Sequence, residues 1–172
     1  SQSSWILEWA EKTPDAIFLA DRTGEKSSWR KITYREFLIQ ITSVAQALLN
    51  RGLSVERPVA ILSDISVDNA LLLFGAMHVG IPVVPISPAY SLMSNDFGKL
   101  KHILGLTNPG LIYVADGEKF AVALKNNDLN GAEIVVSSNA PASINTTDFG
   151  KLLTVTPTSE VETNRKKVGP DT

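Results

Sequence analysis

Short apolar runs alternate with amphipathic segments along most of the chain. Four runs are almost wholly apolar, at 58–63, 81–86, 110–115 and 133–137. Apolar runs of this length predict strands that are buried on both faces, as in a parallel sheet covered by helices. Right-handed crossovers would make the fold a doubly wound α/β layer. Because Pro82 and Pro85 cannot donate to a ladder, we expect the second strand to lie at an edge of the sheet or to be irregular at its ends.

The segments between these runs carry apolar residues at helical spacing. Phe37, Ile41 and Leu48 repeat on one face of a helix. Thr33 and Glu36 have the spacing of a capping box, which predicts that this helix begins just after Thr33. Further helices are expected from Asp64 or Ser66 to about Val79, over 95–104, around 120–124 and over part of 148–153.

The two ends of the chain depart from this alternation. Residues 5–9 have the apolar spacing of a helix, and 16–21 and 29–33 predict an antiparallel hairpin around a turn at 23–25. The last residues are mostly polar, so we expect a loose tail or linker there. The sequence therefore predicts three segments: an N-terminal helix and hairpin over 1–34, an α/β subdomain over 35–153 and a polar tail over 154–172.

Composition narrows the class of protein. The chain has 172 residues, 44% of them hydrophobic, and a formal net charge of −2, whereas nucleic-acid-binding domains normally carry a basic excess. No apolar run approaches the roughly 20 residues that cross a bilayer, and the N-terminal stretch contains Glu8 and lacks the basic lead of a signal peptide. We expect a cytoplasmic protein that binds neither nucleic acid nor membrane; a homo-oligomer is an open alternative.

Candidate ligand-binding residues gather where the predicted strands end, because open α/β sheets bind ligands at the carboxyl ends of their strands. The polar or aromatic residues at these ends are Ser63, Asp64, Ser66, Ser87, Tyr90 and Asp116. Helix capping is the simpler role for Asp64 and Ser66. Ser87, Pro88 and Tyr90 are the candidates for a substrate cleft, since loop aromatics at such edges line pockets. The alternative is that Tyr90 only packs a subdomain seam.

Several chemistries have no candidate residues. The chain has no cysteine, which excludes a disulfide, a thiol nucleophile and Cys-ligated zinc. His78 and His102 lie far apart in the sequence. We expect His78 to be a satisfied or half-exposed histidine and His102 to lie on a solvated helix face, neither with a catalytic role. None of the motifs GxxxxGK(S/T), GxGxxG or GxSxG is present. Without a cluster of backbone amides to hold phosphates, we expect no catalytic, cofactor-binding or metal-binding residue in this chain.

Three stretches resemble the N-terminal part of the adenylate-forming superfamily, which includes acyl-CoA synthetases, firefly luciferases and peptide-synthetase adenylation domains. They are 29–36 (WRKITYRE), 51–62 (RGLSVERPVAIL) and 75–88 (GAMHVGIPVVPISP). The third resembles the pattern G-A-x-x-A-G-x-x-x-x-P-x-x-P, with Val79 in place of a small residue. The next stretch, 89–103, is similar to the branch of feruloyl-CoA synthases.

The resemblance implies an ATP-dependent acyl- or aryl-CoA ligase that uses ATP, Mg²⁺ and CoA and activates a hydroxycinnamate-type acid. In this superfamily the phosphate-binding loop, the ribose-binding motif and the catalytic lysine follow the part that resembles this chain. The resemblance therefore implies an N-terminal fragment that is inactive alone, binds no cofactor and has the remainder of the same polypeptide as its partner. A freestanding flavodoxin-like binding or signalling module is the alternative, although the acidic pair of a receiver domain is missing.

Overall fold

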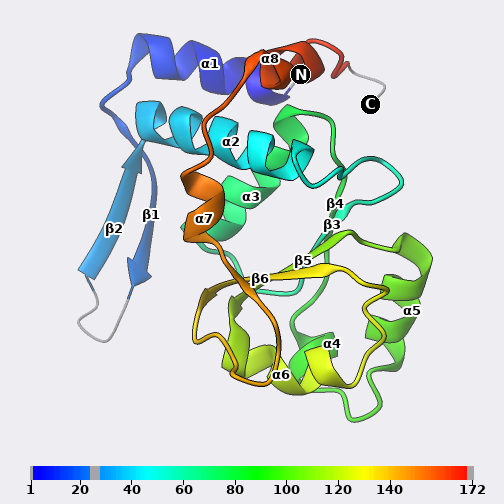
Figure 1. Cartoon of the computed structure of the whole chain (residues 1–172). Helices are drawn as coiled ribbons and strands as arrows, with labels where there is room; N and C mark the ends of the chain where they lie inside the picture. The colour runs from blue at the N-terminus through cyan, green and yellow to red at the C-terminus, as the bar shows by residue number, and fades with distance from the viewer. Residues whose placement is uncertain (1, 24–27, 170–172) are drawn as a thin grey trace.

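The computed structural model describes residues 2–23 and 28–169 (Figure 1). The chain begins with helix α1 (Gln2–Lys12), followed by strands β1 (Ile17–Thr23) and β2 (Ser28–Thr33) and helix α2 (Tyr34–Leu49). The two strands pair antiparallel, which confirms the predicted hairpin. Of the turn expected at 23–25, residues 24 and 25 lie outside the described residues.

A five-stranded parallel sheet forms the centre of the molecule, in the order β4-β3-β5-β6-β7. Its strands are β3 (Val59–Ile61), β4 (Val83–Pro85), β5 (Leu111–Asp116), β6 (Glu133–Ser138) and β7 (Thr147–Asp148). The first four confirm the predicted strands, and β4 lies at the edge, as its prolines required. The two-residue strand β7 was not predicted, because its residues are polar and too few to show a pattern.

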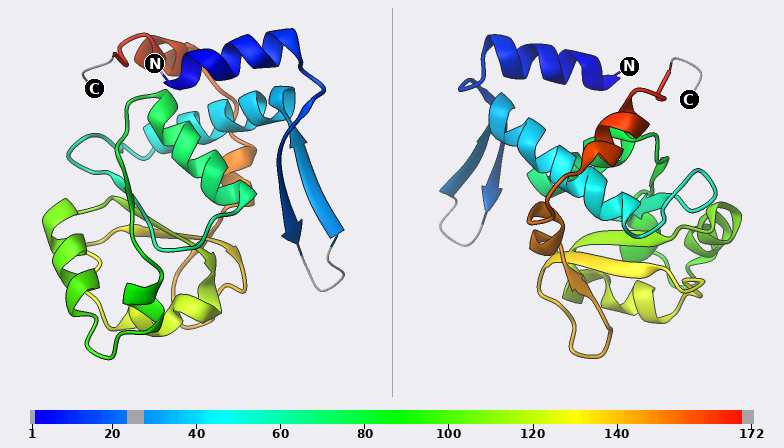
Figure 2. Two further views of the ribbon diagram at one scale, coloured as in Figure 1. Left: turned by 180° about the vertical axis from the view of Figure 1, so that it is seen from behind. Right: turned by 45° about the horizontal axis from the view of Figure 1, so that its top comes forward.

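Helices cover both faces of this sheet (Figure 1, Figure 2). They are α2, α3 (Val67–His78), α4 (Ala89–Leu92), α5 (Gly98–Thr107), α6 (Gly117–Lys125) and α7 (Gly150–Leu153). The last helix, α8 (Ser159–Arg165), packs on α2 and α3. Alternate residues of β5 enter two separate cores: Leu111 and Tyr113 pack with α2 and α3, and Ile112 and Val114 pack with α5 and α6. This confirms the predicted doubly covered α/β layer. No helix among the described residues is long and apolar enough to cross a membrane.

The start of α2 confirms the predicted capping box. The Glu36 amide donates to Thr33 Oγ1 at 3.3 Å, and the Thr33 amide donates to the Glu36 carboxylate at 2.8 Å. The hydrogen bond from the Thr33 amide, and a second from the Thr33 hydroxyl at 2.9 Å, lower the pKa of the Glu36 carboxyl. Ser66 caps α3 in the same way, accepting from the Asn69 amide at 3.1 Å. Both helix starts follow from local hydrogen bonds that the sequence shows directly.

Two local predictions are wrong. Helix α5 continues through Gly105 to Thr107 and ends before Asn108, which has a φ of 44°. A glycine inside a helix lowers its stability but does not by itself end it. The second error concerns the C-terminal segment: residues expected as a loose tail form α8, whose Val161 is only 4% exposed. One buried apolar side chain and a polar cap hold this helix, which composition alone did not indicate.

Helices α2 and α3 pack closely because Gly75 has no side chain at their contact. A Cβ atom on Gly75 would lie 2.7 Å from Val44 Cγ1 and 3.2 Å from the carbonyl oxygen of Ile41. Gly105 in α5 offers a matched control, since a Cβ there would meet no atom within 4 Å.

We expect Gly75→Ala to lower the free energy of unfolding by about 1–3 kcal/mol, because the added methyl group forces the two helices apart. Gly105→Ala should raise it by roughly 0.5–1 kcal/mol, because alanine favours the helix and the site is open. Urea unfolding of both variants measures the difference. Equal stability of the two variants would show that the close contact of α2 and α3 is not a constraint.

Candidate functional site

The carboxyl ends of the parallel strands form the edge at which open α/β sheets bind ligands. Ser63 follows β3, and its Oγ accepts from the Ala115 amide of β5 at 2.5 Å. Asp116 ends β5 and caps α6, accepting from the Lys119 amide at 3.1 Å and from Asn139 Nδ2 at 2.8 Å. Both predicted edge residues therefore have structural partners.

A chain of hydrogen bonds joins the hairpin to this edge of the sheet. Asp68, in the first turn of α3, accepts from Arg30 Nη1 at 2.7 Å and from Ser137 Oγ at 2.7 Å. The Ser137 hydroxyl lies 2.8 Å from the hydroxyl of Tyr113. Because the single proton of Ser137 goes to Asp68, the Tyr113 hydroxyl donates to Ser137.

The groups in this chain of hydrogen bonds carry no net charge at neutral pH. Burial raises the pKa of Tyr113 to about 12, so this hydroxyl stays a donor at neutral pH. The Asp68 carboxylate is balanced by the Arg30 guanidinium. Neither His78 nor His102 takes part, and the one carboxylate, Asp68, already accepts hydrogen bonds from Arg30 and Ser137. The arrangement positions secondary structure rather than transferring protons.

The hairpin has a second attachment to the same helix end. Asp21 Oδ2 accepts from the Val67 amide at 2.8 Å, which places a carboxylate at the N-terminus of α3. Asp21 and Arg30 are cross-strand partners in the hairpin. A two-stranded sheet is marginally stable alone, so these contacts with α3 hold it against the body of the molecule.

Sequence reasoning did not single out Arg30, Asp68, Tyr113 or Ser137. The one available signal was Tyr113, a tyrosine inside an otherwise apolar buried strand, since a buried tyrosine hydroxyl requires a hydrogen-bond partner. The identity of that partner depends on β6 and α3 meeting at one edge of the sheet, which no local pattern encodes.

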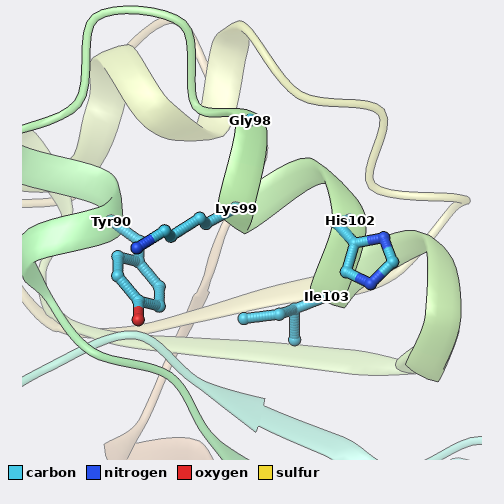
Figure 3. Close-up of a pocket in the computed structure, with 5 residues that line it drawn as sticks. All are labelled: Tyr90, Gly98, Lys99, His102 and Ile103. Atoms are coloured by element: carbon cyan, nitrogen blue, oxygen red, sulfur yellow. The ribbon is translucent and has the colours of Figure 1, made fainter.

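Of the three predicted cleft residues, Tyr90 lines a surface hollow, whereas Ser87 and Pro88 do not. Ser87 and Pro88 connect β4 to α4, where the Ser87 carbonyl accepts from the Tyr90 amide at 3.0 Å. Tyr90 is half-buried against the core formed with α5 and α6. It lines a hollow of about 280 Å³ together with Gly98, Lys99, His102 and Ile103 (Figure 3).

The Lys99 side chain extends beside the Tyr90 ring (Figure 3), with its Nζ 5.1 Å from the ring centroid. An adjoining hollow of about 520 Å³ shares Tyr90, Gly98 and Lys99 and reaches Met93 and Asp96. Ser87 and Pro88 line neither hollow. A substrate-cleft role for Ser87, Pro88 and Tyr90 stays a prediction.

The described residues offer little for a cofactor or metal. Within 2–23 and 28–169, no group of three or more His, Asp or Glu side chains could hold a metal ion. The N-termini of α3 and α6 are capped by the chain's own Ser66 and Asp116. Their amides are therefore partly committed and do not form a free phosphate cradle.

We expect Asp68→Ala to lower the free energy of unfolding by about 1–3 kcal/mol, because it leaves Arg30 and the Ser137 hydroxyl without their acceptor. Hydrogen exchange of the β1 and β2 amides should accelerate. Asp64→Ala is the control: its side chain is 75% exposed and 3.8 Å from Lys119, so a change within about 0.5 kcal/mol is expected. Urea unfolding and hydrogen exchange measure both. Unchanged hairpin protection in Asp68→Ala would contradict this role.

The chain is similar in sequence to AMP-binding enzymes. A family model described as AMP-binding enzyme matches residues 6–169. The PKS-NRPS hybrid synthetase psoA of Aspergillus fumigatus is 28% identical over 104 residues, covering 60% of this chain and 2% of the synthetase. This chain thus spans a small part of that relative.

Two solved structures share the fold. A putative long-chain-fatty-acid CoA ligase from Rhodopseudomonas palustris superposes with a TM-score of 0.70 at 19% identity, covering 91% of this chain and 37% of the ligase. A fatty acyl-adenylate ligase from L. pneumophila, in complex with acyl adenylate and pyrophosphate, gives a TM-score of 0.63 at 17% identity, with 92% of this chain and 26% of that chain covered. Because the family model spans almost the whole chain, this protein belongs to the AMP-binding enzyme family of the adenylate-forming superfamily.

Proposed function

We propose that this chain is the N-terminal part of an ATP-dependent acyl- or aryl-CoA ligase. The observation that carries the proposal is the AMP-binding match over residues 6–169. The fold shared with a fatty acyl-adenylate ligase and a putative fatty-acid CoA ligase supports it. In such a reaction a carboxylate oxygen attacks the α-phosphorus of ATP and pyrophosphate leaves. The CoA sulfur then attacks the acyl carbon and AMP leaves with the carboxylate oxygen.

This segment would contribute a structural framework and no reacting group. It provides a parallel sheet whose carboxyl edge carries the Asp68 hydrogen-bond chain and, beyond β4, Tyr90. The N-termini of α3 and α6 are already capped by Ser66 and Asp116, which argues against ATP phosphates binding there. ATP, Mg²⁺ and CoA would therefore be held by residues in the remainder of the same polypeptide, and this segment alone would be inactive.

For the substrate, we propose a hydroxycinnamate-type acid, because residues 89–103 resemble feruloyl-CoA synthases. The match to a PKS-NRPS hybrid synthetase favours a second candidate, an amino acid activated for peptide synthesis. The two are distinguished by assaying the polypeptide that contains this chain. The first assay is carboxylate-dependent ATP–pyrophosphate exchange, with ferulate, coumarate and caffeate as one set of acids and the protein amino acids as the other. The second assay measures thioester formation with CoA. Exchange with neither set would refute adenylation of these acids.

The 172-residue chain itself should give no ATP–pyrophosphate exchange with ferulate, coumarate or caffeate, because Ser66 and Asp116 cap α3 and α6 and no amide-rich phosphate loop is recognised in its sequence. Radiolabelled pyrophosphate incorporation into ATP measures this, with a heat-treated sample as the background. Exchange above that background would show that the phosphate-binding residues lie within residues 1–172.

A role for Tyr90 in the substrate cleft predicts a specific kinetic change in the longer polypeptide. Tyr90→Ala should raise the KM for the aromatic acid and leave the KM for ATP unchanged, because only a contact with the acid is lost. Tyr90→Phe, which keeps the ring, should behave like the parent. If Tyr90→Ala instead lowers stability by about 3–5 kcal/mol, as for a packed aromatic residue, and leaves both KM values unchanged, Tyr90 is structural.

A further inference from the structure

Helix α8 covers the end of α3, where a histidine is buried. His78 is the last residue of α3 and is 2% exposed. Helix α8 packs against both α2 and α3, and Figure 2 shows it lying across α2 near the chain termini. The contact brings together residues that are about half the chain length apart.

Among residues 2–23 and 28–169, few interactions hold α8 in place. Gln46 of α2, itself buried, accepts from the Thr158 amide at 2.8 Å and from Thr158 Oγ1 at 2.7 Å. Its Nε2 donates to Glu160 at 3.2 Å. Val161 is the one buried residue of α8. A seven-residue helix is unstable without such packing, so α8 belongs to the part of the fold that opens at low free-energy cost.

His78 lies in this contact as a neutral ring. Its Nδ1 is buried and has no hydrogen-bond partner. The pKa of His78 is lowered to about 4, mainly by burial and in addition by the positive charge of Arg165, against the opposing effect of Glu162. Protonation would place an Nδ1–H without an acceptor, and a second cation near Arg165, inside the closed contact.

The charged groups of α8 that act on His78 keep their charge as the pH falls. Arg165 donates to both carboxylate oxygens of Glu162, at 2.7 and 2.6 Å, and Lys166 lies 3.5 Å from the same carboxylate. The hydrogen bond from Arg165 lowers the pKa of Glu162 to about 2. From α2, the group in contact with α8 is the uncharged Gln46 amide, which binds Glu160. His78 is therefore the group whose charge changes in mildly acidic conditions.

We propose that α8 is a pH-sensitive latch, closed over neutral His78 and opened when His78 takes up a proton. When α8 is displaced, water reaches the ring, and the pKa of His78 returns toward its ordinary 6.5. Because the open state takes up a proton more readily than the closed state, falling pH favours opening. The free energy that keeps α8 closed is therefore largest above about pH 6.5 and decreases as the pH falls toward 4. Uptake of one proton by the imidazole is the only chemical change, and it is reversible.

Hydrogen–deuterium exchange of the 172-residue chain at about pH 7.5 and about pH 5, corrected for the intrinsic rates, tests the latch. The protection of the α8 amides should fall roughly 30-fold at the lower pH, the ratio given by closed and open pKa values of about 4 and 6.5. Protection of the β5 amides should stay constant. His78→Leu should abolish the pH dependence of α8, and His102→Leu, at the other, exposed histidine, should retain it.

Gln46→Ala calibrates the measurement, since loss of the Thr158 contacts should weaken α8 protection at both pH values. His78→Gln, which also cannot take up a proton, replaces His78→Leu if the latter does not fold. The proposal is overturned if α8 protection in the parent does not change with pH. It is also overturned if the fall persists without His78, or if β5 loses protection to the same extent, since the opening would then be global.

Discussion

The structure depends on the burial of β5 from both sides. This strand lies between β3 and β6, and its side chains alternate between two apolar cores. A strand buried on both faces requires helices above and below, and the crossover connections of a parallel sheet supply them. Polar groups are then excluded from the middle of the sheet and gather at the ends of its strands. The site of any chemistry is thus decided by the same burial that stabilises the fold.

Tyr113 is the point at which this apolar strand meets the polar edge. Its ring packs in the core beside Phe149, with ring centroids 5.5 Å apart, while its hydroxyl reaches Ser137. Through Ser137 and Asp68 the hydrogen bonds continue to Arg30 in the hairpin. The hairpin, the first turn of α3 and the end of β6 are consequently held in one relative position. In a multidomain ligase such an edge would present fixed surfaces to the segments that carry the reacting groups.

The N-terminal and C-terminal segments are held in different ways. Helix α1 joins the main core through Ile6, and Trp5 packs edge-on against Phe18 and Phe74. Helix α8 joins the same core through Val161 alone and otherwise relies on the side-chain amide of Gln46. The apolar residues that each segment contributes explain this contrast. Helix α1 is an integral part of the core, and α8 is a cover that a single proton on His78 can weaken.

The sequence by itself determined those features whose cause is local. Four apolar runs predicted four parallel strands, and the missing donors of Pro82 and Pro85 indicated that β4 lies at an edge. The capping box of Thr33 and Glu36 predicted where α2 begins. Each of these causes acts within a few residues of the chain. Only the tertiary structure decided the helical state of α8, the short strand β7 and the hydrogen bonds between Arg30, Asp68, Ser137 and Tyr113. Each of these depends on partners far away in the chain, such as Gln46 for Thr158 or Ser137 for Asp68. A polar residue whose partner is brought near only by folding has no periodic or neighbouring signal in the sequence.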